Sequence, residues 1–180
     1  CLVFGSTSTP SQGLILDVVD IGDGATDQAY ANREVYGKVV LTSGSSRTVF
    51  QKAVKKRGAI GVLTDYMPSQ NSSIRRTPCD LPDAVNYASF PVTHEDMGKT
   101  AFGFSLSLRQ AQEIRELLKN GPVKVKAEVE ADLFAGDIQV LTGVIPGTDK
   151  EGEVLIIAHL CHPMPGANDN ASGCGLAMEL

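Results

Sequence analysis

The 180-residue sequence has no tryptophan, few aromatic residues and no excess of basic residues. Its net charge of −5 and pI near 5.2 argue against a nucleic-acid-binding surface, because such surfaces are usually basic. No apolar run approaches the roughly 18 residues that a membrane-spanning helix needs, and no signal-peptide pattern opens the chain. With 42% hydrophobic and 21% charged residues, the composition is that of a folded, soluble protein.

The cysteines form no recognisable framework. Cys1, Cys79, Cys161 and Cys174 show no CxxC pair and no regular spacing, so neither a zinc ribbon nor a disulfide scaffold is indicated, and their redox state stays open. The first methionine is Met67, so we expect a chain that begins after processing or that is a fragment of something longer.

The first part of the chain alternates apolar runs with helical patterns. Residues 13–21, 36–42 and 59–65 are apolar or β-branched runs bounded by turn residues, which predicts strands. Between the second and third of these, residues 48–56 show apolar positions on one face of a 3.6-residue period, which predicts a helix. Strand, helix and strand together are typical of a βαβ-like unit.

Residues 67–89 form a polar excursion that is long for a compact domain, and such loops are often functional. A short strand is expected at 90–93. The clearest helix is expected at 107–121, where Ser107 and Gln110 have the spacing of a capping box, and a half-exposed strand follows at 123–129.

Beyond a change of composition at 131–136, two further strands are expected. Residues 137–145 form the first, and 154–158 (VLIIA) form a continuous apolar run of the kind buried on both faces of a parallel sheet. A Gly/Asn/Pro-rich segment follows at 163–173, and then the start of a helix.

The chemically informative residues lie in this last region. His159 follows the expected buried strand, at the edge where parallel sheets bind ligands, and Asp169 lies in a tight loop that opens a helix. Imidazole and carboxylate are ordinary zinc ligands, and a carboxylate can bridge two ions. A hydrogen-bonded imidazole and an Asx-turn or N-cap carboxylate explain the same residues.

Residues 136–180 resemble the opening of the catalytic domain of the co-catalytic dizinc aminopeptidases, on the strength of VLTGVIPGTDKEGEVLIIAHLCHPMPGANDNASG. The GANDNASG loop is the specific part of this match. The resemblance implies that His159 is a ligand to one zinc and that Asp169 bridges both. The catalytic general base, a glutamate, and the remaining ligands are then expected downstream of Leu180.

One departure from that pattern concerns Cys161, which stands where the family has an aspartate that orients the metal-bound histidine. Cys161 is therefore expected as a structural cysteine, with a role as a soft ligand left open, and His162 is an alternative candidate. Asn170, beside Asp169, completes the residues whose part in the site is uncertain.

Residues 3–130 resemble the protease-associated (PA) domain, through LDVVDIGDG, YGKVVLTSG, VFQKAVKKRGAIGVLTDY and FPVTHEDMG. The resemblance implies a small β-rich module, an open barrel or sandwich with flanking helices, that supplies no catalytic residue. Such modules cover an active site or engage substrates and partner proteins, which makes residues 67–89 the candidate contact surface.

The sequence thus predicts an α+β protein, with a PA-like domain at 1–133 and, at 134–180, the first strands of an α/β zinc-peptidase domain. The expected function is that of a fragment of a zinc aminopeptidase that removes N-terminal residues from peptides or proteins. The fragment itself is expected to be inactive, with its zinc sites unoccupied. The full-length enzyme would hold two zinc ions.

Two other functions remain open at this point. One is a protein-association module whose attached peptidase domain has lost its metals, and the other is a thiol hydrolase that uses Cys161. No nucleic-acid partner and no membrane span are expected, and the oligomeric state is undetermined. A secreted or cell-envelope location is favoured over a cytoplasmic one, because proteins that carry PA domains beside a peptidase are often exported.

Overall fold

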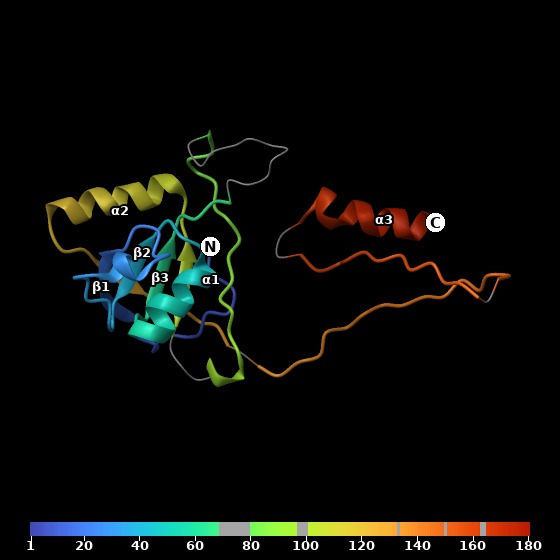
Figure 1. The fold of residues 1–180 in the computed structure, drawn as a ribbon, viewed down its shortest axis with the longest axis horizontal. Helices are drawn as coiled ribbons and strands as arrows, with labels where there is room; N and C mark the ends of the chain where they lie inside the picture. Colours follow the sequence, from blue (N-terminus) through green and yellow to red (C-terminus); the bar gives the residue numbers. More distant parts are fainter. Residues whose placement is uncertain (69–79, 97–100, 133, 150, 163–164) are drawn as a thin grey trace. The chain divides into compact units, whose positions relative to one another are not determined.

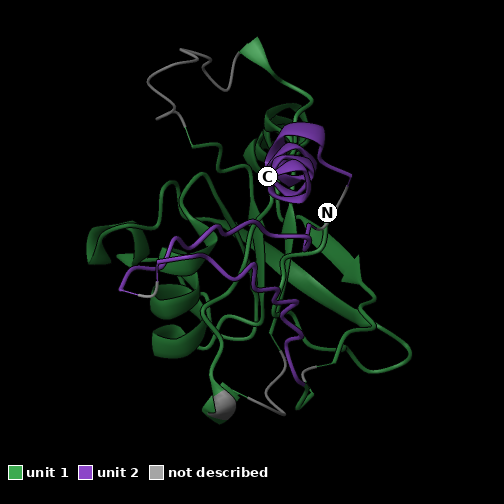
Figure 2. Ribbon diagram, turned by 90° about the vertical axis from the view of Figure 1, so that its right-hand side faces the viewer, with its two compact units in different colours: residues 1–136 green, residues 137–180 purple. Residues whose placement is uncertain are grey.

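The computed structural model describes residues 1–68, 80–96, 101–132, 134–149, 151–162 and 165–180. The chain divides into two compact units, unit 1 (Cys1–Gly136) and unit 2 (Asp137–Leu180), coloured separately in Figure 2. The domain boundary expected between residues 133 and 134 lies close to this division. It stays a prediction, because compactness alone does not identify a domain family.

Unit 1 is a mixed α+β structure built on one curled, half-barrel-like sheet with the strand order β4-β3-β2-β1-β5 (Figure 1). Neighbouring strands from β1 to β4 run parallel, and β5 is antiparallel to β1. The strands are β1 (Leu14–Asp20), β2 (Val39–Thr42), β3 (Gly61–Thr64), β4 (Phe102–Ser105) and β5 (Lys124–Ala127). The expected PA-like barrel or sandwich stays a prediction at this level of detail.

The helices of unit 1 follow the apolar periodicity of the sequence. They are η1 (Asp27–Tyr30), α1 (Ser46–Val49), η2 (Phe50–Lys55), η4 (His94–Asp96) and α2 (Leu108–Asn120). The helix expected at 48–56 is present as α1 continued by the π-helical η2, and it joins the parallel strands β2 and β3. The βαβ-like prediction is therefore confirmed.

The core of unit 1 lies on both faces of the sheet. Val40 and Val62, paired in register, pack in one cluster with Val49 and Phe50 of the helical segment. Alternate strand residues pack in a second cluster with Ala111 of α2. Because β2 (VVLT) and β3 (GVLT) are covered on both faces, all of their residues are buried, which explains why their sequences are mostly apolar.

Helix α2 begins as its sequence predicts. The Ser107 backbone N–H donates to Gln110 Oε1 at 3.0 Å, and the Gln110 backbone N–H donates to Ser107 Oγ at 3.3 Å. This reciprocal capping box satisfies two backbone N–H groups that a helix start leaves unpaired.

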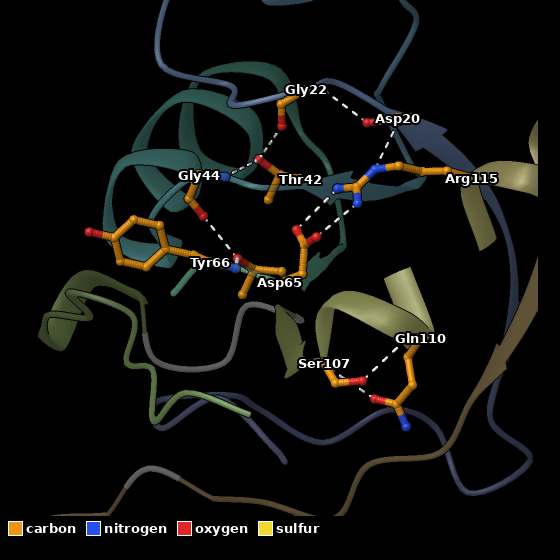
Figure 3. Close-up of polar contacts among 10 residues, drawn as sticks. Asp20, Gly22, Thr42, Gly44, Asp65, Tyr66, Ser107, Gln110 and Arg115 are labelled. Atoms are coloured by element: carbon orange, nitrogen blue, oxygen red, sulfur yellow. Dashed lines mark hydrogen bonds and ion pairs between the residues drawn. The ribbon is translucent and has the colours of Figure 1, made fainter. Parts of the chain in front are cut away.

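The carboxyl ends of the parallel strands carry a row of hydroxyl groups. Thr42 Oγ1 donates to the Gly22 carbonyl and accepts from the Gly44 N–H (Figure 3). Thr64 Oγ1 donates to the Gly44 carbonyl. Ser105 continues the row in register, and its buried hydroxyl has no partner among the described residues. The two threonine hydroxyls at this edge are thus engaged in joining the loops of unit 1 to one another.

Arg115 of α2 ties the helix to the same edge of the sheet. Its guanidinium forms two hydrogen bonds to Asp65, at 2.8 and 3.0 Å, and its Nε lies 3.4 Å from Asp20 Oδ2 (Figure 3). Asp65 follows β3 and Asp20 ends β1, so one side chain of α2 joins the ends of two strands that are not neighbours.

The sequence did not anticipate β4, which is the outer strand beside β3. Conversely, the prediction of a strand at 90–93 is wrong. These residues form no strand, and the nearest sheet-like pairing is an isolated bridge between Phe4 and Ser89. Pro91 explains the difference, since proline has no N–H to donate to a sheet.

Unit 2 contains η5 (Ala167–Ala171) and α3 (Ser172–Glu179), so the helix start expected near the end of the chain is present. The strands expected at 137–145 and 154–158 are wrong, because the described residues of unit 2 contain no strand. Val154, Leu155 and Ile157 are 89, 77 and 80% exposed instead of buried. A strand needs a neighbour for its backbone hydrogen bonds, and these segments have none in the described chain.

No helix in the part of the chain that the structure describes combines the length and hydropathy required to cross a membrane. The candidate contact surface at 67–89 is described only at its ends, since residues 69–79 lie outside the described residues. Near its second end, Asp83 accepts two hydrogen bonds from Arg109 of α2, at 2.7 and 3.1 Å, which fastens the segment to that helix.

Candidate metal centre

The residues singled out from the sequence lie together in unit 2. His159 ends an extended segment, and Asp169 lies in η5, where its backbone departs from helical geometry with φ −112° and ψ 93°. His159 Nε2 and Asp169 Oδ1 are 2.9 Å apart, so the two groups predicted to act together are in direct contact.

The second nitrogen of the His159 ring has its own partner. Nδ1 lies 3.0 Å from the backbone carbonyl oxygen of Cys161. Because a carbonyl oxygen only accepts hydrogen bonds, Nδ1 carries a proton there, and the ring is turned so that Nε2 faces Asp169. This is the arrangement in which metal-binding histidines are commonly held, with one ring nitrogen donating to a fixed acceptor and the other facing the ion.

Cys161 therefore orients His159 through its main chain. The resemblance noted from the sequence leads to the expectation of an aspartate side chain for this task, at the position of Cys161. The Cys161 carbonyl supplies an acceptor of the required kind whatever the side chain is. The thiol is exposed and is not in a disulfide.

His162 approaches the same carboxylate from its other side. Its Nε2 is 3.8 Å from Asp169 Oδ2, the oxygen that His159 does not contact. Both oxygens of Asp169 are thus faced by imidazole nitrogens, one within hydrogen-bonding distance and one beyond it.

Two further side chains hold the backbone at His159. The Asn170 amide donates to the His159 carbonyl at 3.5 Å, and the Cys174 thiol donates to the same oxygen at 3.2 Å. The sequence analysis gave Cys174 no part in the site. No spacing signal indicates one, because Cys174, near the start of α3, contacts His159 only through the way the helix lies against that residue.

A cavity of about 410 Å³ opens beside these groups, lined by both histidines, Asn170 and Cys174 among others. All of the site side chains are at least partly open to solvent, with His159 and Asp169 49 and 67% exposed. The cavity is large enough to admit an ion.

The chemistry of the donors fits zinc. Neutral imidazole nitrogen and carboxylate oxygen are its usual protein ligands besides thiolate. Among the described residues, however, no group of three or more histidine, cysteine or acidic side chains is already arranged as a metal cage.

Comparison with known proteins gives little. No protein-family model matches the sequence, and no curated protein matches it. A solved structure similar to the chain is that of a peptidase M28 precursor from Shewanella amazonensis, with a TM-score of 0.40 and 15% sequence identity. The match covers 70% of this chain and 31% of that one, so the chain spans less than a third of the length of the protein it resembles.

Proposed function

We propose that the chain is part of a zinc-dependent, aminopeptidase-like exopeptidase, in which unit 2 contributes His159 and Asp169 to a two-metal centre. The observation that carries the proposal is the 2.9 Å contact between His159 Nε2 and Asp169 Oδ1. These are the imidazole and the carboxylate to which the resemblance of the GANDNASG segment assigns zinc. Their meeting in one small unit supports that assignment.

Each residue would have a separate task. His159, oriented by the Cys161 carbonyl, would hold one ion through Nε2. Asp169 has two carboxylate oxygens and would bridge the two ions, as hydrolytic two-metal sites require. Bound zinc acts as a Lewis acid on a peptide carbonyl, which is the chemistry the site would gain.

Other residues of the proposed enzyme would supply the remaining ligands and the general base. A catalytic zinc has about three protein ligands, so His159 and Asp169 need further residues to complete the centre. In the proposed enzyme these, and the glutamate that takes the proton from the attacking water, come from sequence outside the 180 residues. Unit 1 would serve as the surface that contacts a peptide or protein substrate, or a partner. The 180-residue chain alone is then inactive.

The test is zinc binding by the chain, measured by isothermal titration calorimetry in the presence of a reductant. Because the chain supplies only part of the ligand set, the proposal expects weak but saturable binding at millimolar zinc. This binding should weaken at least about tenfold in His159→Ala and in Asp169→Asn, since even loss of an outer contact commonly costs about 10- to 100-fold in metal affinity. Asp149→Asn is the matched control, an exposed carboxylate of the same unit whose contact is to the Glu151 backbone.

Four results would contradict the proposal. Absence of zinc binding by the wild-type chain would favour the non-catalytic association module, and equal binding by the His159 and Asp169 variants would place the ion elsewhere. Metal-dependent hydrolysis of aminoacyl p-nitroanilides by the 180-residue chain would refute the statement that it is inactive. Hydrolysis that resists chelators and is stopped by iodoacetamide would instead indicate a thiol hydrolase.

A further inference from the structure

We infer that unit 1 binds a basic side chain, lysine or arginine, of a peptide or protein, in a cavity at the amino ends of β2, β3 and β4. The inference rests on the part of the proposed function in which unit 1 contacts a substrate or partner. It gives that contact a place and a chemistry. The described residues that line the cavity lie outside 67–89, the contact surface expected from the sequence.

The cavity has a volume of about 610 Å³, which is within the range of pockets that take small ligands. Its walls are mostly apolar. They come from the residues before the three strands, from η2 and from the segment after Pro91, and include Gly37, Ile60, Ala101, Phe50, Val54 and Val92. Such walls can pack against the methylene groups of a lysine or arginine side chain.

The charged groups that line the cavity leave one negative charge unbalanced. Lys55 Nζ lies 2.9 Å from Asp96 Oδ2, and the Asp96 side chain is only 7% exposed, so these two charges compensate each other. Asp96 also accepts hydrogen bonds from the backbone N–H and the hydroxyl of Thr93, at 2.8 and 3.0 Å.

Glu95, the next residue of η4, supplies the remaining charge. It lines the cavity, is exposed, and has no ion-pair partner within the part of the chain that the structure describes. Charge complementarity therefore favours a cationic ligand over an anionic one. An apolar stem that ends in a cation is the structure of a basic side chain.

Tyr36 adds an aromatic ring to the same cavity. The residue is 75% exposed, and its ring lies against Gly58, where a Cβ atom would come within 2.6 Å of Tyr36 Cδ2. Gly58 has a φ of +71°, in the left-handed region that favours glycine. The Gly37 N–H donates to the Gly58 carbonyl at 2.9 Å, which holds the two segments together. An accessible aromatic face attracts a cation, so Tyr36 and Glu95 favour the same ligand.

The experiment is an NMR titration of the 180-residue chain with the blocked peptide acetyl-Gly-Gly-Lys-Gly-Gly-amide, in EDTA so that unit 2 holds no metal. We expect saturable shifts of the Gly37 and Gly58 amide signals, and an affinity that falls as salt is added. The same peptide with Nε-acetyllysine keeps the stem and loses the charge, and should bind at least about threefold more weakly. A glutamate peptide should cause no saturable shift.

Matched variants test the two groups separately. Glu95→Gln should weaken binding of the lysine peptide about two- to fivefold. Glu130→Gln removes an exposed carboxylate of unit 1 that does not line the cavity, and should leave the affinity unchanged. Tyr36→Leu should weaken binding about two- to fivefold, whereas Tyr36→Phe, which keeps the ring, should bind like wild type.

The outcomes separate this inference from the rest of the proposed function. Lysine-peptide binding that is equal in wild type and Glu95→Gln, or that shifts only residues away from the cavity, overturns the inference and leaves the contact role of unit 1 standing. Equal affinity for the lysine and Nε-acetyllysine peptides overturns it as well, because the charge is then not recognised. Absence of binding by every peptide overturns both the inference and the contact role. Absence of zinc binding beside retained lysine-peptide binding overturns the metal centre alone. The dispersion of each variant's spectrum shows whether it has folded.

Discussion

Removing the guanidinium of Arg115 should destabilise unit 1 more than most single substitutions. Its partner Asp65 has a side chain that is only 3% exposed, and Arg115 forms two hydrogen bonds to it, at 2.8 and 3.0 Å. The hydrogen bonds that Arg115 donates to Asp65 raise the pKa of Arg115 above its ordinary value, so the guanidinium is charged at neutral pH. In Arg115→Ala the Asp65 carboxylate would stay buried without a countercharge.

The size of the effect follows from that burial. Breaking a buried ion pair by removing one partner costs about 3–5 kcal/mol, because the remaining charge is shielded from water and has no opposite charge to compensate for the lost solvation. Asp20, at 3.4 Å from the Arg115 Nε, is 35% exposed and adds little, as partly solvated pairs do. Arg115→Lys keeps the charge but loses the paired geometry, and should cost about 1.5–3 kcal/mol.

Urea unfolding followed by far-ultraviolet circular dichroism measures these free energies, since the protein has no tryptophan to report by fluorescence. The double variant Asp65→Ala/Arg115→Ala should lose less than the sum of the two single variants, because no unpaired charge remains in it. The reasoning is refuted if Arg115→Ala costs less than about 1 kcal/mol, or if the two single costs add without interaction.

Two smaller predictions concern other polar contacts of unit 1. Ser107→Ala removes the hydroxyl that caps α2 through the Gln110 N–H, and urea unfolding should show a loss of about 0.5–2 kcal/mol; an unchanged midpoint would mean that solvent caps the helix equally well. Burial raises the pKa of Asp96, but hydrogen bonds from Lys55 and Thr93 outweigh it and hold that pKa below the ordinary 3.8. The stabilisation by Asp96 is therefore complete above about pH 4 and lost as the pH falls through the lower folded-state value. The difference in unfolding free energy between wild type and Asp96→Asn should shrink on acidification, and a constant difference would contradict the assignment.

Under the proposed function, the candidate centre would tolerate a cysteine where the resemblance leads to the expectation of an aspartate. A histidine needs an acceptor at Nδ1 to keep Nε2 free for an ion, and the acceptor can be a carboxylate, a backbone carbonyl or water. Here the carbonyl of the substituted residue itself accepts from His159. In the proposed enzyme, activity would then depend on the ligands that complete the centre more than on the side chain at position 161.

Local sequence patterns were sufficient to predict several secondary-structure elements. Residues close in sequence specify the capping box of α2 and the strand–helix–strand unit around α1. Helix starts and apolar periodicity depend on contacts within a few positions of the chain. The pairing of His159 with Asp169 was also expected from the sequence. The resemblance of the GANDNASG loop had placed both residues beside the same ions.

Other features depended on contacts between distant parts of the chain. Strand β4 has hydrogen-bonding partners in β3, whereas the equally apolar segment 154–158 has no strand beside it and stays exposed. The Cys161 carbonyl and the approach of His162 to Asp169 depend on how the backbone turns between them. Sequence thus determined which groups carry the chemistry, and tertiary structure decided which of their atoms meet, because strand pairing and main-chain direction are set by neighbours in space.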